Sequence, residues 1–262
     1  MKTNQRAMLW AALLLFVCSL STFAQEAKKQ LFVVHEDVVK PSMVTKYEKI
    51  SKNLVTQLKE HGVSEISEMC AATNDFHYYY ITPVDNMAAL DEKPWKSVQE
   101  KMGKEAFEKM WEGYGECYDK HSTYMLSLSP EDSYDPQNSD IMDPEALYRR
   151  WQFFYIDPAK AEASNKVVKK WKALSESKNI ANGYRVYRGG MGTEQPLILV
   201  IEWAKDAAAL AAQNAEDAKL YGEEGQELWG KTLSITRKYE VKEGTMRPDL
   251  SYVPGQVLAD QE

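Results

Sequence analysis

The sequence predicts an α+β protein in which one βαββαβ unit occurs twice. Short runs of β-branched and aromatic residues alternate with stretches of helical periodicity. Segments of the first half return in the second half in the same order. A stretch rich in proline and aspartate separates the two halves. Each unit is therefore expected to form an antiparallel sheet with its helices on one face.

The first copy is expected to span residues 25–129. Pro41 is placed to open its first helix, because a missing N–H costs least in the first turn, and Gly62 is placed to end that helix. Apolar residues recur between them at intervals of three or four, which indicates one buried helix face. In order, the expected elements are a strand at 30–35, a helix at 41–62, strands at 65–72 and 76–82, a helix at 95–118 and a strand at 123–129.

The second copy is expected to span residues 145–240. Its glycine-rich segment 189–192 predicts a hairpin turn and not a phosphate loop, because no Lys-Ser/Thr ending follows. In order, the expected elements are a strand at 150–156, a helix carrying Val167, Val168, Trp171 and Leu174, hairpin strands at 184–188 and 197–203, an alanine-rich helix after Asp206 and a strand at 232–239. Both copies thus have the order of the ferredoxin-like split βαβ unit.

The register of the repeat predicts one insertion. The matches in order are Asp37 with Asp157, Leu90 with Leu210, and Leu126-Ser127-Leu128 with Leu233-Ser234-Ile235. In the first two matches the paired residues are the same distance apart in the sequence, and in the last match they are closer together. A single change of register predicts an insertion in the first copy, around residues 91–103.

Residues 1–24 are expected to be a signal peptide. Lys2 and Arg6 give a basic start, an apolar run follows, and Ala24 supplies a small residue before the cleavage site. The apolar run is short for a bilayer-spanning helix, and a retained anchor stays an alternative. Lipidation of Cys18 is a second alternative, although a lipoprotein motif normally has a small residue just before the cysteine and this chain has Val17. The protein is therefore expected to be secreted or periplasmic.

Composition excludes several classes of protein. The 262 residues are 44% hydrophobic and 27% charged, which is ordinary for a globular protein and unlike a multi-span membrane protein. A formal net charge of −7 leaves no basic surplus to neutralise phosphates, so a general nucleic-acid binder is excluded. No CxxC, HExxH or GxSxG motif occurs, and no metal site is expected.

A solvated linker is expected at 130–144 and a loose tail at 241–262.

The segment 202–210, Glu-Trp-Ala-Lys-Asp-Ala-Ala-Ala-Leu, ends a predicted strand with tryptophan and opens an alanine-rich helix. With the doubled βαββαβ order, it resembles the dimeric α/β-barrel superfamily. The resemblance implies that two antiparallel sheets pack face to face, here within one chain as an intramolecular pseudo-dimeric barrel. Members include cofactor-independent monooxygenases, haem-degrading monooxygenases, stress-response proteins and proteins of no assigned activity, and the fold alone does not fix the function.

Haem-degrading members are similar in having a Trp and a His at the spacing of Trp111 and His121, with an Asn on the first strand. Residues 30–37 of this chain contain no Asn. No cofactor is therefore expected, and haem stays an alternative. The structural interpretation is that Trp111 packs in the core and His121 caps a helix end.

All four histidines lie in the first copy, which favours specialisation of that half. His35 ends the first predicted strand and His77 begins the third, so both are candidates to border a barrel cavity as a base or a ligand. The repeat pairs His35 with Tyr155. With Trp111 and His121, these two histidines are the candidate catalytic residues, against the ordinary role of packed side chains.

Aromatic residues alternate along two predicted strands and either line an apolar pocket or fill a sheet core. Tyr79, Tyr155 and Trp203 are the candidate ligand-binding residues. Cys70 and Cys117 remain after export and either form a disulfide or lie buried as two thiols.

The sequence thus predicts an exported protein that binds a small apolar or aromatic ligand in a barrel cavity. One alternative is a monooxygenase of the superfamily, cofactor-independent or haem-dependent. Another is an interaction module of the cell envelope. Whether the protein is an enzyme stays open. The expected partner is a small molecule and not a nucleic acid, and no membrane span is expected after cleavage of the signal peptide. The chain is expected to be a monomer with an internal pseudo-dimer, or a higher oligomer.

Overall fold

The computed structural model describes residues 29–140 and 142–255. The predicted signal peptide, with Cys18, lies outside these residues. The first half contains β1 (Leu31–Val39), α2 (Val44–Glu60), β2 (Met69–Thr73), β3 (His77–Val84), α3 (Pro94–Met102), α4 (Lys104–Gly115) and β4 (Tyr118–Leu128). The second half contains β5 (Tyr148–Ile156), α5 (Ala161–Ser177), β6 (Arg185–Gly189), β7 (Leu197–Ala204), α6 (Ala207–Ile235) and β8 (Thr236–Met246).

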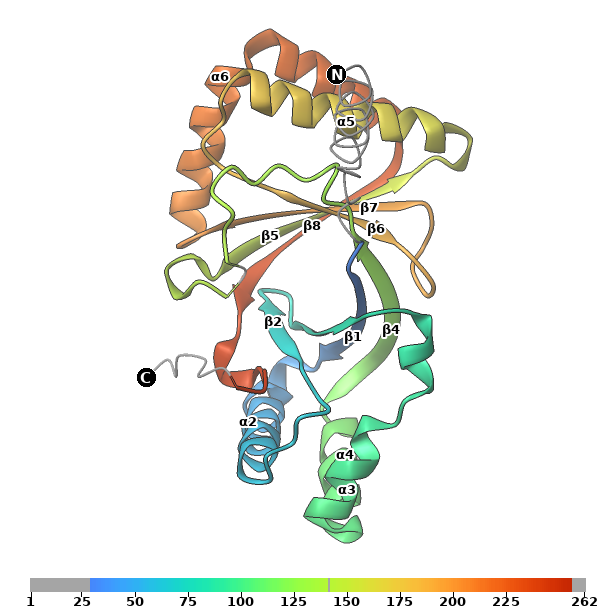
Figure 1. Cartoon of the computed structure of the whole chain (residues 1–262). Helices are drawn as coiled ribbons and strands as arrows, with labels where there is room; N and C mark the ends of the chain where they lie inside the picture. The colour runs from blue at the N-terminus through green and yellow to red at the C-terminus, as the bar shows by residue number, and fades with distance from the viewer. Residues whose placement is uncertain (1–28, 141, 256–262) are drawn as a thin grey trace, which may run out of the picture.

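The eight strands form a closed antiparallel barrel in the order β1-β3-β2-β8-β5-β7-β6-β4. The predicted α+β class and barrel are therefore confirmed. Each half contributes four neighbouring strands, and the halves join where β2 pairs with β8 and β4 pairs with β6. Figure 1 shows the helices outside the barrel, with α5 and α6 on the β5–β8 side and α2, α3 and α4 on the opposite side. No described helix is long and apolar enough to cross a membrane.

The two halves correspond residue by residue in their sheets. Leu31 pairs with Val84 and Ser127, and Tyr148 pairs with Ala204 and Thr245. The β1–β4 ladder shifts after Val38 and the β5–β8 ladder shifts after Tyr155, which is the same place in each half. The helices that follow, α2 and α5, both have 17 residues. Equivalent positions can therefore be read from the strand registers.

These registers correct the predicted insertion at 91–103. Leu126–Leu128 belongs to β4, whereas Leu233–Ile235 is the end of α6, so the two segments are not equivalent. The strand equivalent to β4 is β8. The same registers place Gln152, and not Tyr155, opposite His35 in the repeat.

Glycines with positive φ set the shape of the helices. Gly103, at φ 87°, divides the helix predicted at 95–118 into α3 and α4. Gly222, at φ 56°, kinks α6 without ending it, so this helix reaches Ile235.

Strand pairing extends two elements beyond their predicted bounds. β4 begins at Tyr118 rather than at residue 123, because its ladder with β1 continues to Val39. β8 begins at Thr236 and continues to Met246, because it pairs along the whole of β5 and then with β2. Residues 241–246, predicted as part of a loose tail, are therefore a barrel strand.

The predicted linker packs against the second half. Asp132 is buried and forms an ion pair with Arg188 at 2.5 Å, and Asp135 contacts Arg185 at 3.3 Å. The acidic residues that were expected to keep this segment solvated are instead partners of two arginines on β6.

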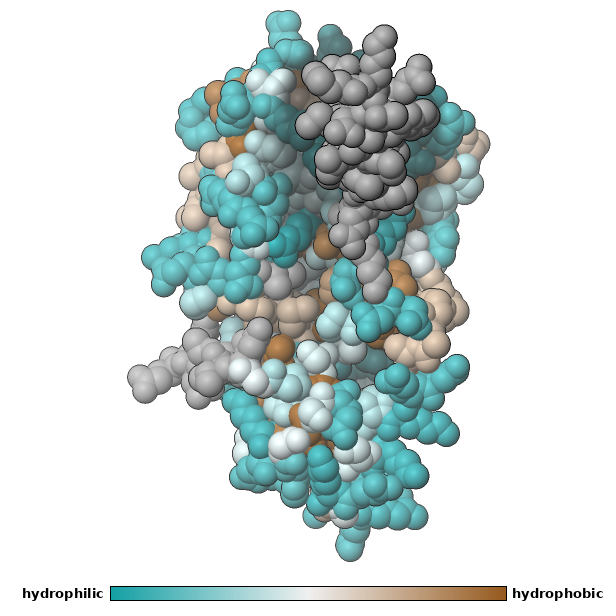
Figure 2. Space-filling model, in the orientation of Figure 1, coloured by the Kyte–Doolittle hydropathy of each residue, from teal (hydrophilic) through white to brown (hydrophobic). Residues whose placement is uncertain are grey.

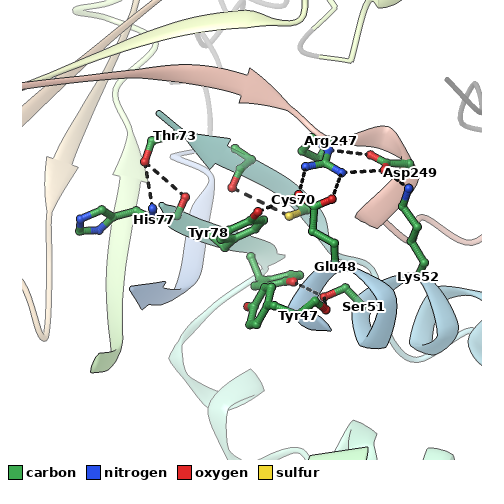
Figure 3. A network of polar contacts seen from close by, with 12 residues as sticks. Tyr47, Glu48, Ser51, Lys52, Cys70, Thr73, His77, Tyr78, Arg247 and Asp249 are labelled. Carbon is green, nitrogen blue, oxygen red and sulfur yellow. Dashed lines mark hydrogen bonds and ion pairs between the residues drawn. The ribbon is translucent and has the colours of Figure 1, made fainter. Parts of the chain in front are cut away.

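The segment after β8 returns to the first half. Figure 3 shows Arg247 between Glu48 of α2 and Asp249, with Lys52 beside Asp249. Arg247 Nη2 donates to Glu48 Oε2 at 3.0 Å and to Asp249 Oδ2 at 2.8 Å. Tyr78 donates to Glu48 at 2.7 Å. This network ties the end of the second half to α2. On the face seen in Figure 2, hydrophilic residues cover most of the surface, as expected for solvated helix faces.

Candidate functional site

An interior space with a mostly apolar lining lies between the second half of the sheet and the helices that cover it. It has a volume of about 260 Å³. We call it the α5–α6 cavity. Its walls come from the outward face of β5, β6 and β7 and from the inward faces of α5 and α6. The apolar lining includes Phe154, Ile156, Val167, Val168, Trp171, Val186, Ile198, Val200, Leu210, Trp229 and Ile235.

One end of the cavity is polar. Glu202 on β7 lies directly across the ladder from Arg150 on β5, and both side chains line the cavity. Gln152 Nε2 donates to Glu202 Oε2 at 3.0 Å, while Gln152 Oε1 accepts from the Tyr239 hydroxyl at 2.6 Å. Tyr239 therefore fixes the orientation of the Gln152 amide, and Gln152 in turn orients the carboxyl group of Glu202.

Two buried polar atoms at this end have no hydrogen-bond partner. They are Nε of Arg150, a donor, and Oε1 of Gln213, an acceptor on α6. The nearest ionic partner of Arg150 Nε is Glu243 Oε1, at 3.9 Å. Because buried polar groups are usually paired, an unpaired donor and an unpaired acceptor that line one cavity indicate a ligand with complementary groups.

Burial raises the pKa of Glu202 above its usual range, and the positive charge of Arg150 and the hydrogen bonds from Asn214 and Gln152 oppose this shift. Burial also raises the pKa of Asp217, which α6 brings to the same cavity and which accepts from Asn182 Nδ2 at 3.0 Å. A carboxyl group with a raised pKa in an apolar cavity is suited to proton transfer near neutral pH.

The first half shows why the second half has room for a cavity. Tyr47 of α2 and Tyr80 of β3 fill the equivalent space, and their positions are taken by Ser164 and Val200 in the second half. The first-half hydroxyls are paired, with Tyr47 donating to Asp37 at 2.6 Å and Tyr80 at 2.9 Å from Ser51. The fold therefore packs this layer tightly in one half and leaves it open in the other.

The barrel interior, predicted to hold the ligand, is filled by side chains instead. Its remaining space is about 40 Å³, too small for an aromatic molecule. Tyr79 packs there against Trp151, with ring centroids 6.0 Å apart. Tyr79 is thus a core residue. Tyr155 lies at the end of β5 beneath Lys238, whose Nζ is 4.4 Å from the ring centroid. Of the three predicted ligand-binding residues, Trp203 alone lines the α5–α6 cavity.

Two of the predicted catalytic histidines, His35 and His121, form a pair outside the α5–α6 cavity. His121 Nδ1 lies 2.6 Å from Asp37 Oδ1, and its ring stacks on His35 with centroids 5.8 Å apart. Burial lowers the pKa of His35, and the neighbouring His121 lowers it further. His35 Nδ1 is 2.9 Å from the Thr123 hydroxyl. His121 lies within strand β4, so the interpretation of this residue as a helix cap is wrong.

His77 and Trp111 are apart from this pair. His77 Nδ1 lies 2.6 Å from Glu36 Oε1 at the start of β3. Trp111, on α4, is 41% exposed and packs edge-on against Trp95 and Phe107, so its interpretation as a core residue is wrong. None of the contacts of Trp111 joins it to His121, so the structure does not bring together the pair that the haem-degrading resemblance implied.

Cys70 and Cys117 are both free and buried, so the disulfide left open by the sequence is not formed. Both thiols belong to the core between the first half of the sheet and α2 and α4. Among the described residues, no group of three or more His, Cys, Asp or Glu side chains could hold a metal ion.

The polar residues of the cavity were missed in the sequence. A signal existed, because Glu202 interrupts the apolar strand Leu197–Ala204 and Arg150 interrupts the aromatic strand Tyr148–Ile156. Polar residues on a strand whose two faces are both covered need a partner. The pairing of these two residues, however, depends on the register of β5 with β7, which the sequence does not show.

Comparisons with known proteins agree with this architecture. No family model and no curated protein matches the chain. An anthrone oxidase-like protein is similar in structure, with a TM-score of 0.60 at 12% identity over 90% of this chain and 98% of that one. The chain has the dimeric α/β-barrel fold.

Two further solved structures share this dimeric α/β-barrel fold. A candidate monooxygenase from Fusobacterium nucleatum subsp. nucleatum ATCC 25586 has a TM-score of 0.52 at 11% identity, covering 84% of this chain and 93% of its own. A candidate monooxygenase from Lactobacillus acidophilus NCFM has a TM-score of 0.50 at 12% identity, covering 88% and 100%. At these identities the comparisons establish the fold alone.

Proposed function

We propose that the protein binds a small aromatic or apolar molecule that carries a polar group, and that the α5–α6 cavity is the binding site. The observation that supports this proposal most strongly is the cavity itself, with apolar walls and an unpaired donor and acceptor at one end. Trp171 and Trp229 supply flat surfaces for an aromatic ring, and Arg150 supplies a donor for an oxygen atom.

Anthrone, a flat tricyclic ketone, is a suitable probe for this site. We expect saturable quenching of tryptophan fluorescence with one molecule bound per chain, because three tryptophans, Trp171, Trp203 and Trp229, line the cavity. Native mass spectrometry of protein purified from its source is expected to show a retained small molecule. A fluorescence signal that stays linear in anthrone up to its solubility limit would contradict the proposal.

A second candidate function is oxidation of the bound molecule by oxygen. The printed descriptions of the similar structures, two candidate monooxygenases and an anthrone oxidase-like protein, raise this candidate. Glu202 supports it, because a base that ionises the ligand makes it easier to oxidise. An oxygen electrode would test it, since the oxidase alternative requires oxygen uptake on addition of anthrone.

Haem was the other alternative, and the residues present do not favour it. The lining of the α5–α6 cavity contains no His, Cys or Met, which are the side chains that hold iron in most haem proteins. Tyr184 and Tyr221 are the only tyrosines in that lining. The residues that line this cavity therefore do not fit a haem group. A saturable Soret shift on titration with haemin would reverse this conclusion.

We also propose that the protein is exported and that its halves arose by duplication. The residues that support export are the basic start and apolar run before Ala24, and the equivalent strand registers support duplication. The amino-terminal sequence of the protein isolated from its source tests the first proposal, since export predicts a mature chain that begins at Gln25. The cell-envelope interaction module stays an alternative, without a surface that favours it.

A further inference from the structure

We propose that Glu202 is a catalytic base that removes a proton from a carbon acid bound in the α5–α6 cavity, specifically an aromatic ketone whose oxygen Arg150 binds. This inference rests on the proposed binding function and deepens it. It assigns a substrate class, a ketone with an acidic C–H bond in a ring position, and roles to Glu202, Arg150 and Gln152.

The hydrogen bonds around Glu202 favour a carboxylate that acts as a base. The Tyr239 hydroxyl donates to Gln152 Oε1 at 2.6 Å, so the amide of Gln152 presents its NH₂ group to Glu202. An NH₂ group donates, and it therefore stabilises Glu202 as an acceptor. Gln152 and Asn214 each donate a hydrogen bond to the Glu202 carboxylate, and the remaining lone pairs of its two oxygens can accept a proton from a substrate.

Arg150 is placed to bind the oxygen atom on which negative charge develops. It is the cross-strand neighbour of Glu202, and its buried Nε has no hydrogen-bond partner. The charged groups nearest to Glu202 are Arg150 on β5 and Asp217 on α6, and the other polar neighbours, Gln152 and Asn214, are neutral. A base and an oxyanion donor thus lie side by side on adjacent strands.

The fold itself does not require these residues. In the first half, Val33 and Thr82 occupy the positions of Arg150 and Glu202, and they pair across the same ladder. Tyrosine side chains fill the space above them. The carboxylate, the guanidinium and the cavity occur together in the second half alone among the described residues, which is expected of a site rather than of a structural requirement.

The step is a proton transfer and needs no oxidant. The C–H bond of the ketone breaks, and its proton forms an O–H bond on a carboxylate oxygen of Glu202. The electron pair of the C–H bond stays on the ligand and is delocalised onto the ketone oxygen, which becomes an enolate oxygen hydrogen-bonded to Arg150. Return of the proton from Glu202 to carbon gives the keto form. Protonation of the oxygen by solvent gives the enol form, and Glu202 then releases its proton to solvent.

Deuterium exchange tests this role without any second substrate. Anthrone is incubated with the full chain in D₂O without oxygen, and loss of the C10 proton signal is followed by NMR. We expect exchange faster than in buffer, and we expect E202Q to lower the catalysed rate by about 100-fold or more, as for other general bases. Glu227→Gln is the matched control, because Glu227 is an exposed carboxylate elsewhere on α6, with 74% side-chain exposure.

Two measurements separate catalysis from folding and from binding. Circular dichroism checks that E202Q is folded, and E202D, which keeps a carboxylate, is expected to retain part of the rate and its increase with pH. Tryptophan quenching gives Kd for each variant. Binding without exchange, or equal exchange by E202Q and wild type, overturns the role of Glu202 and leaves the binding proposal intact. Absence of anthrone binding to the wild type overturns both.

Discussion

At the scale of single residues, the fold places several carboxyl groups where ionisation is costly. Glu68, next to β2, is the clearest case, because burial raises its pKa to about 7 although a hydrogen bond with Thr82 opposes this shift. A carboxyl group with a raised pKa in the folded state binds a proton that the unfolded chain releases. The stability that this proton contributes is present below the ordinary pKa of glutamate and is lost as pH rises through about 7.

We therefore expect the free energy of unfolding of the wild type to fall between about pH 4.5 and 8 and that of E68Q to change less. The difference between the two proteins is expected to reach about 2–3 kcal/mol at pH 8, because one pKa unit corresponds to about 1.4 kcal/mol. Urea unfolding at several pH values measures it. Glu65→Gln is the control, because its carboxyl is exposed and hydrogen bonds lower its pKa. Parallel curves for wild type and E68Q would contradict the prediction.

Individual site residues could be predicted from the sequence only in part. The sequence pointed to Trp203, because a tryptophan ends an apolar strand beside an alanine-rich helix. It did not indicate Glu202 in the same strand as a site residue, since the role of Glu202 depends on Gln152 and Arg150, about fifty residues away on β5. The histidines, by contrast, were predicted to be catalytic because histidine often acts as a base or a ligand, and the structure places them outside the α5–α6 cavity.

At the scale of elements, the difference between the two helix–sheet layers depends on a few side-chain volumes. In the first half, Tyr80 on β3 fills the layer under α2, and Val200 takes its place on β7. We expect V200Y to fill the α5–α6 cavity and to weaken anthrone binding by more than tenfold. The melting temperature should change little, because the added ring enters existing space rather than a packed core.

The reverse substitution is the matched control for that experiment. Tyr80→Val removes a buried ring from the tightly packed half and breaks its contact with Ser51, so a loss of about 3–4 kcal/mol of stability is expected. Calorimetry and fluorescence titration measure the two effects. Tight anthrone binding by V200Y would show that the ligand lies elsewhere.

The order of elements followed well from local patterns, whereas their ends did not. The helix from Pro41 was predicted from its apolar spacing and its glycine, and the structure gives α2 at Val44–Glu60. The beginning of β4 at Tyr118 and the end of β8 at Met246 were missed, because barrel closure extends strands through residues of mixed polarity. In α6, periodicity could not show that the helix continues past Gly222.

At the scale of the whole molecule, the halves are held together by short strand pairings and by the return of the chain onto α2. Arg247 carries much of the second connection, since it contacts both Glu48 and Asp249 and lowers the pKa of both carboxyl groups below their usual values. Removing one member of such an ion-pair network leaves the remaining charges unpaired and partly buried, which destabilises the folded state.

We expect R247M to lower the free energy of unfolding by about 3 kcal/mol, because it leaves Glu48 and Asp249 without their common partner. Lys219→Met is the control, since Lys219 forms an exposed pair with Glu216 and its removal should cost less than about 1 kcal/mol. Equal stability of the two variants in urea would show that the network does not join the halves.

The closed barrel could be expected from the doubled βαββαβ order, but the place of the ligand site could not. An eight-stranded barrel is either filled by side chains or holds one small ligand, and here side chains that include Tyr79 and Trp151 fill it. The available space lies outside the barrel, under α5 and α6. Its existence depends on small residues at Ser164 and Val200, which no periodicity distinguishes from ordinary core positions.

Methyl-group NMR with anthrone tests the central claim most directly, because it reports where the ligand binds. We predict shifts for methyl groups that line the α5–α6 cavity, namely those of Val168, Ile198 and Val200, and none for Val34 and Leu126 inside the barrel. Saturable shifts confined to Val34 and Leu126, with the cavity methyl groups unchanged, would contradict it.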